Sequence, residues 1–110
     1  MKRIDKPWGH EIIWAHTKRY VGKILHIKEG HQLSKQYHQT KEETIYVLKG
    51  VLYNYDMDDN VNKVREGESF HILPHQIHRF GAPEGMVELV EVSTPQLEDV
   101  VRIEDDYDRQ

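Results

Sequence analysis

The chain has 110 residues, of which 31% are charged, and its 15 Lys and Arg against 19 Asp and Glu give a formal net charge of −4. This length supports a single domain over residues 1–110, because it leaves no room for a second core. The acidic balance argues against a nucleic-acid partner, and the absence of cysteine excludes disulfides and thiolate metal sites. No apolar run approaches the length that spans a membrane, so we expect a cytoplasmic protein without a membrane partner.

Short strands separated by glycine and proline turns are predicted along the chain. A loose lead-in over residues 1–5 and a turn at residues 6–9 precede strands at 11–14 and 20–27. Trp8, within that turn, is expected to cover one end of the core because its side chain is too large and apolar to be left exposed at the surface.

The segment 30–50 organises the candidate site and is expected to form one β-hairpin. Gln36 and His38 project together, because side chains two residues apart on a strand share a face. Glu43 returns on the second strand and faces them. An amide oxygen, an imidazole and a carboxylate suit a divalent first-row metal, and His78 is expected to add the fourth ligand.

Further strands are predicted at 51–55, 61–65, 69–73 and 86–92, and residues 76–80 lead into a loop. The segment 86–92 alternates apolar and acidic residues, which indicates a strand with one buried face. The tail after Pro95 is compatible with a short helix or with an extended arm across the barrel or a partner subunit. About eight or nine short strands without a helical period predict an all-β fold, antiparallel and closed or sandwiched.

The spacing of the candidate ligands resembles the first motif of the cupin superfamily. Five residues separate Gly30 from Gln36, four separate His38 from Glu43, and six separate Glu43 from Gly50. Gln36 stands where that motif usually has its first histidine. The resemblance implies a small antiparallel jelly-roll barrel of the RmlC-like type with a metal site.

A closer resemblance covers essentially the whole chain. The residues that carry it are, in order, Lys6-Pro7-Trp8-Gly9, Lys23, Leu33-Ser34-x-Gln36-x-His38, Lys41-x-Glu43, Pro74-x-x-x-His78-Arg79, Val90-Glu91-Val92 and Glu98-Asp99-x-Val101-Arg102-x-x-Asp105-x-Tyr107-x-Arg109. Together they resemble the C-terminal cupin domain of type II mannose-6-phosphate isomerases, which is often fused to a mannose-1-phosphate guanylyltransferase. The Gln-x-His form of the first motif is usual in that family.

Some positions depart from the family's pattern. His75 and Asp108 stand where glycine is usual, and Lys41 stands where arginine is usual. No glycine-rich nucleotide loop precedes the motifs, so a guanylyltransferase unit is not expected in this sequence.

The resemblance implies a metal-dependent sugar-phosphate isomerase that interconverts mannose 6-phosphate and fructose 6-phosphate. The reaction moves a proton between two carbons and needs an electrophile, a base and a cationic group for the phosphate. One divalent ion per chain on Gln36, His38, Glu43 and His78 supplies the electrophile. Zinc is the expected metal, with iron, manganese and nickel as alternatives.

Arg79 and Glu91 are the candidate catalytic residues. The resemblance implies a substrate-side role for Arg79, whose guanidinium suits phosphate, and an ion pair with the acidic tail is the alternative. Glu91 is a candidate base because apolar neighbours on its strand would raise its pKa. His71 and Glu11 are alternative bases, and His71 is also a candidate for an inner histidine near the metal.

Two other functions stay open at this point: a non-catalytic module that binds a sugar or nucleotide sugar, and a small iron cupin with oxygen-dependent chemistry. A homodimer is also expected. The strand at 86–92 is taken as an exposed edge, and apolar residues of the tail need cover that one small barrel does not provide.

Overall fold

The computed structural model describes residues 1–109, which form β-strands and contain no helix, and therefore none that could cross a membrane. The strands are β1 (Lys2–Lys6), β2 (Gly9–His16), β3 (Val21–Ile27), β4 (Lys35–Tyr37), β5 (Glu43–Lys49), β6 (Leu52–Tyr55), β7 (Val61–Val64), β8 (Ser69–Ile72), β9 (Arg79–Gly81), β10 (Val87–Ser93) and β11 (Val101–Glu104). The predicted all-β antiparallel fold is confirmed.

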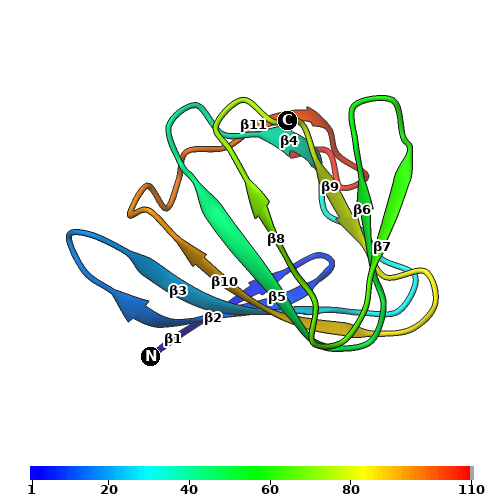
Figure 1. Ribbon diagram of the computed structural model, residues 1–110, viewed down its shortest axis with the longest axis horizontal. Coiled ribbons are helices and arrows are strands. Elements are labelled where there is room, and N and C mark those ends of the chain that lie inside the picture. The colour runs from blue at the N-terminus through cyan, green and yellow to red at the C-terminus, as the bar shows by residue number, and fades with distance from the viewer. Residues whose placement is uncertain (110) are drawn as a thin grey trace.

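The strands form two walls of a barrel (Figure 1). One wall is a six-stranded sheet in the order β1-β2-β3-β10-β5-β8, and every pair in it is antiparallel. The other wall combines the sheet β7-β6-β9 with the pair β11-β4. An isolated bridge between Gln36 and His78 joins these two small sheets, so the segments that carry these two residues lie in the second wall.

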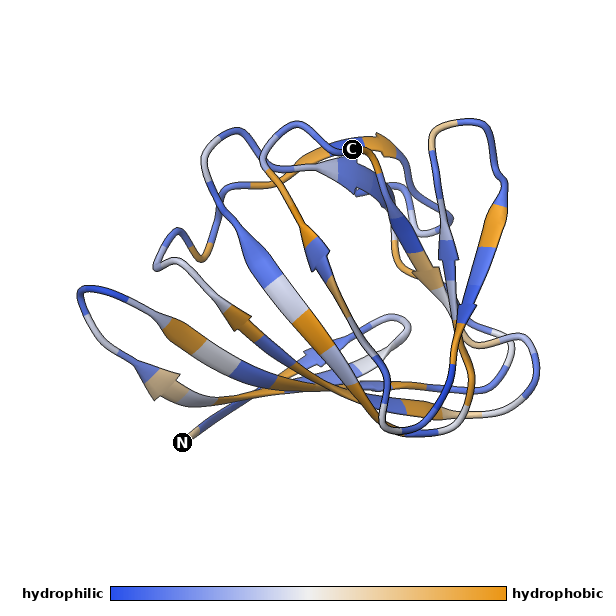
Figure 2. Ribbon diagram, viewed as in Figure 1, coloured by the Kyte–Doolittle hydropathy of each residue, from blue (hydrophilic) through white to orange (hydrophobic). Residues whose placement is uncertain are grey.

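The core follows from side-chain alternation along the six-stranded sheet. Ile45 and Val47 of β5 and Val87 and Leu89 of β10 are fully buried, while the residues between them are more exposed. Trp8 is 3% exposed and belongs to the same cluster, in agreement with its predicted place in the core. Figure 2 shows the hydrophobic positions concentrated in the strands, whereas the connecting loops are largely hydrophilic.

The lead-in and the described part of the tail each contribute a strand. The lead-in predicted for residues 1–5 is wrong, because β1 pairs with β2 over its whole length as the edge of the sheet. Between the two alternatives for the tail, the structure has the extended arm: β11 pairs with β4 across the second wall.

The hairpin predicted for residues 30–50 is wrong. β4 pairs with β11, whereas β5 pairs with β10 and β8 in the opposite wall. The chain crosses the barrel between His38 and Glu43, so the candidate ligands face one another across the interior and not along a ladder.

The segment 86–92 is also not an edge strand, since β10 lies between β3 and β5. The edges of the sheet are β1 and β8. This removes one reason for expecting a homodimer, which stays a prediction that light scattering tests.

Two residues that stand where the family usually has glycine keep the backbone conformation that glycine favours. His75 has φ of 70° and Asp108 has φ of 56°, both in the left-handed region that costs non-glycine residues energy. The His75 amide donates a hydrogen bond of 2.6 Å to the carbonyl of His38, so this turn ties the two histidine-bearing segments together.

Candidate metal centre

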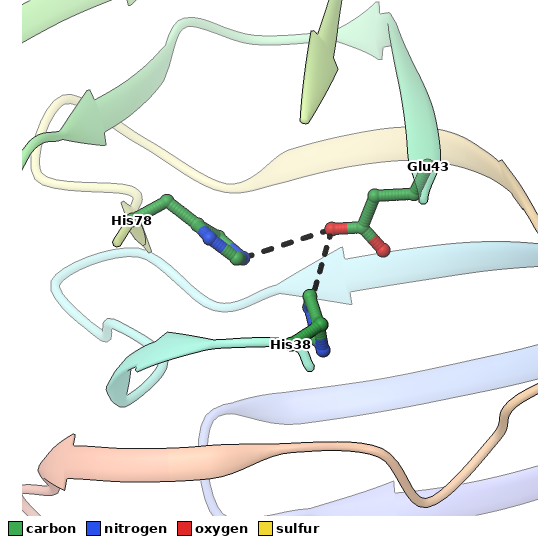
Figure 3. Close-up of side chains that lie close together, drawn as sticks. All are labelled: His38, Glu43 and His78. Carbon is green, nitrogen blue, oxygen red and sulfur yellow. Dashed lines mark ion pairs between the residues drawn. The ribbon is translucent and has the colours of Figure 1, made fainter. Parts of the chain in front are cut away.

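Three side chains from separate segments converge inside the barrel (Figure 3). His38 follows β4, Glu43 begins β5, and His78 precedes β9. The Nε2 atoms of both histidines lie 3.7 Å from Oε1 of Glu43, and the three donor atoms all lie within 4.8 Å of one another. All three residues are buried, so the structure brings together three of the four predicted ligands.

The hydrogen bonds of the two imidazoles turn their free nitrogens inward. Nδ1 of His38 lies 2.5 Å from the carbonyl oxygen of Asp99, and Nδ1 of His78 lies 2.9 Å from that of Gln76. A ring that donates Nδ1–H to a carbonyl keeps its lone pair on Nε2, the arrangement typical of metal-binding histidine. Both Nε2 atoms are buried and have no hydrogen-bond partner within residues 1–109.

This geometry fits a divalent ion. Donors around a tetrahedral zinc at about 2.1 Å lie about 3.4 Å apart, close to the separations between Glu43 and each histidine. Gln36 lines the same cavity as His38, and its Oε1 accepts a hydrogen bond of 2.6 Å from Ser34. An amide oxygen has two lone pairs, so this bond leaves one for a metal.

The ionisation of the three ligands also suits a cation. Burial disfavours the charged carboxylate, but His38, Lys41 and His78 outweigh it and hold the pKa of Glu43 well below its usual range. Burial lowers the pKa of His78. The pKa of His38 is raised, because Glu43 outweighs the effect of burial there.

Asp99, in the arm before β11, positions His38 and the loop after it. Its backbone carbonyl accepts a hydrogen bond from Nδ1–H of His38, while its carboxylate accepts hydrogen bonds from the amides of residues 39, 40 and 41 and from the Thr40 hydroxyl. These bonds hold the pKa of Asp99 well below its usual value. The arm therefore holds residues 39–41, where the chain crosses from one wall to the other. The predicted hairpin had no such crossing.

The candidate metal centre opens on a cavity of about 380 Å³. Its lining combines the apolar side chains of Trp8, Leu25, Leu33 and Phe80 with charged ones from both walls and from the arm. A cavity of this size that combines apolar walls with a few polar groups is typical of a small-molecule site.

Lys41 links the metal centre to the candidate base Glu91. Its Nζ lies 3.1 Å from Oε2 of Glu43 and 3.0 Å from Oε2 of Glu91, and all three side chains are buried. Burial and the charge of Glu43 raise the pKa of Glu91, although Lys41 opposes them. Glu11 and Lys23 form a second buried pair at 3.5 Å on the cavity wall.

Comparison with known proteins identifies the family. Residues 1–105 match the family model described as Mannose-6-phosphate isomerase C-terminal. The chain belongs to this family. A mannose-1-phosphate guanylyltransferase from Sinorhizobium fredii (strain NBRC 101917 / NGR234) is 30% identical over 105 residues, and the match covers 92% of this chain but only 20% of that protein. The chain thus spans about a fifth of the length of this curated relative.

Solved structures place this member of the mannose-6-phosphate isomerase C-terminal family in the cupin fold. KdgF from Halomonas sp. superposes with a TM-score of 0.78 at 19% identity over 90% of each chain. An RmlC-like cupin from Shewanella frigidimarina NCIMB 400 gives 0.76 at 18% identity, covering 89% of this chain and 86% of that one. A cupin-superfamily sugar phosphate isomerase from Silicibacter pomeroyi DSS-3 gives 0.69 at 14% identity, covering 77% and 58%. These likenesses confirm the predicted jelly-roll barrel.

The other predicted site residues lie in different places. Glu91 and Glu11 line the cavity, but His71 is exposed on the outer face of β8, where it contacts Thr44 and Glu42, so its predicted place near the metal is wrong. Arg79 is buried outside the lining. Its guanidinium donates to the Leu33 carbonyl and pairs with the acidic tail, which was the alternative prediction.

Sequence reasoning missed the roles of Asp99 and Arg102. Both fall in the tail segment that resembles the family, but nothing local in the sequence shows that Asp99 binds the loop after His38. Only the pairing of β11 with β4 reveals that Arg102 lies opposite Gln36 and lines the cavity.

Proposed function

We propose that this domain is a metal-dependent sugar-phosphate isomerase of the mannose-6-phosphate/fructose-6-phosphate type. The observation that carries the proposal is the pair of inward-facing Nε2 atoms beside Glu43, which have no hydrogen-bond partner within the described residues. They lie at a cavity that Glu91 and Lys41 also line. Membership of the mannose-6-phosphate isomerase C-terminal family supports the proposed substrate class.

The metal ligands in this proposal are Gln36, His38, Glu43 and His78, with zinc as the expected ion. A divalent cation at this site, when bound, supplies electrophilic polarisation of sugar oxygens. Two neutral imidazoles, one amide and one carboxylate leave about one net positive charge on such a centre, so its electrophilic character is retained.

Glu91 is the proposed general base. It lines the cavity, and its raised pKa moves it toward the range in which a carboxylate accepts a proton efficiently near neutral pH. The Lys41 ammonium at 3.0 Å keeps the ionised form accessible in spite of burial. Glu11 also lines the cavity, but it is paired with Lys23 on the neighbouring strand, so we assign it to the support of that wall.

A coupled assay with mannose 6-phosphate and fructose 6-phosphate tests the proposal. We expect turnover that disappears when metal is removed and returns when it is added back. Glu91→Gln should retain metal but lose about 10²- to 10⁴-fold in turnover, the range for a general base. Glu88→Gln is the matched control, because Glu88 lies on the same strand and pairs with His26 outside the cavity lining.

Two outcomes would replace the proposal. Sugar binding without metal-dependent turnover on any hexose 6-phosphate indicates the non-catalytic binding module. Stoichiometric iron with oxygen consumption indicates the oxygen-dependent cupin.

A further inference from the structure

Five cationic side chains line the cavity, and three of them have carboxylate partners. Lys23 pairs with Glu11, Lys41 pairs with Glu43 and Glu91, and Arg109 holds Asp105 through two bonds of 2.8 and 3.1 Å. The other two are Lys6 and Arg102, and neither has an ion pair with any residue of the 1–109 range.

Arg102 is the more unusual of the two. Its Nε atom is buried and has no hydrogen-bond acceptor among the described residues. Leaving a buried, charged donor unsatisfied is costly, and native proteins rarely do so without a bound partner. Arg79 provides the contrast, because its guanidinium donates hydrogen bonds to a carbonyl and a carboxylate and pairs with a second carboxylate.

The position of Arg102 on β11 places its guanidinium at the cavity, where the substrate is proposed to bind. In the β11–β4 ladder Arg102 lies directly opposite Gln36, and directly opposite residues place their side chains on the same face. Both side chains line the cavity, as does Lys6 at the end of β1 beside the turn that carries Trp8. A guanidinium and an ammonium that have no ion pair within residues 1–109 thus share the cavity with the metal centre.

We infer that Arg102 and Lys6 form an anion subsite that binds the phosphate monoester of the substrate; this inference rests on the proposed function and specifies where its substrate is held. A guanidinium binds phosphate through two parallel N–H donors, and a second cation matches the dianionic charge of a monoester. This subsite takes the role that the sequence predicted for Arg79, whose donors are already engaged outside the cavity lining.

Titration of the metal-loaded, full-length protein with inorganic phosphate, followed by calorimetry, tests the subsite. Arg102→Gln should raise the apparent Kd about 10- to 100-fold, the range for hydrogen bonds to a charged group. Arg102→Lys, which keeps the charge but loses the fork, should give an intermediate value. Arg19→Gln removes the same charge from an exposed loop and should bind phosphate as the unmodified protein does.

His38→Ala separates the subsite from the metal, because phosphate also coordinates metal ions. We expect this variant to lose metal and keep phosphate binding, whereas Arg102→Gln keeps metal and loses phosphate binding. Phosphate affinity that disappears with the metal, or that is unchanged in both Arg102 variants, would overturn the subsite.

Sugar ligands distinguish a phosphate monoester from other anions. Mannose 6-phosphate should bind at least tenfold more tightly than mannose, and Arg102→Gln should remove that difference. Equal affinity for mannuronate, which carries a carboxylate, would overturn the assignment to phosphate.

The same variants keep this inference distinct from the proposed function. Loss of phosphate affinity in Arg102→Gln, with no turnover by the unmodified protein, upholds the subsite and refutes the isomerase. Turnover with an unchanged KM in Arg102→Gln upholds the isomerase and refutes the subsite.

Discussion

The two ends of the barrel interior are built from the same strands but differ in chemistry. On β10 the inward side chain at one end is Val87 and toward the other end is Glu91, and on β3 the corresponding residues are Ile27 and Lys23. Burying a charge costs several kcal/mol unless a partner compensates it. The apolar end therefore stabilises the fold, whereas the charged end needs its ion pairs and suits a binding site.

The largest expected effect is at the charged end, where His38→Ala should remove the metal. Removing one imidazole leaves Glu43 and His78 without the third donor from the crossing segment, so bound metal should fall from near one per chain to near zero, and turnover should fall with it. Elemental analysis of protein purified without chelator measures this. Unchanged occupancy in the variant would remove His38 from the ligand set.

Leu89→Ala probes the apolar end of the same strand that carries Glu91. Because Leu89 is fully buried, its truncation should lower the free energy of unfolding by about 2.5–5 kcal/mol while metal content stays the same. Glu91→Gln, two residues along the same face, should lower it by less than Leu89→Ala does, because the amide keeps the shape and Lys41 keeps Glu43 as its partner. Denaturant titration of both variants gives the comparison, and equal losses would show that the ends do not differ in this way.

The gain in unfolding free energy that bound metal provides should depend on pH, because the metal ligands at the charged end titrate. Protonation of His38, whose pKa Glu43 raises, competes with metal at Nε2, whereas burial lowers the pKa of His78 and keeps that ring neutral. Metal at about 100 times its Kd should add about 2.7 kcal/mol at pH 8, and this gain should fade as the pH drops through the imidazole range. Thermal unfolding with and without metal from pH 8 to pH 5 tests the direction, and a gain that grows on acidification would contradict it.

The smallest effect concerns the turn between β8 and β9, next to the charged end. His75→Gly should raise stability by about 0.5–1 kcal/mol, because glycine relieves the left-handed backbone but also loosens the unfolded chain. His71→Gly is the matched control within β8, where glycine should lower stability by a similar amount. Denaturant midpoints decide the sign, and a loss of stability in both variants would show that the turn is not strained.

Much of the fold follows from the sequence, because strand alternation and turn residues are local signals. The apolar and acidic pattern of residues 86–92 predicted a strand with one buried face, and β10 has one. This face includes the acidic Glu91, however, whereas the apolar Val92 is exposed, so the pattern did not identify which residues are buried. The place of β10 in the sheet was not predictable in this way, since an edge strand and a central strand differ mainly in what lies beside them. The crossing between His38 and Glu43 was missed for the same reason.

The candidate site was predictable where its spacing resembled a known motif. His38, Glu43 and His78 converge as expected, although they do so across the barrel. The ion pairs of Arg79 and the position of Arg102 opposite Gln36 depend on how the tail lies on the second wall, which the ambiguous pattern after Pro95 did not specify.

The contacts of Asp99 have a consequence for the order of folding. They join positions 58 to 61 residues apart in the chain, and loop-closure entropy must be overcome before such distant pairings form. Because the orientation of the His38 ring depends on the Asp99 carbonyl, a partly folded chain with its arm undocked would present an incomplete set of donors. Metal capture is therefore expected late in folding, after the arm has docked.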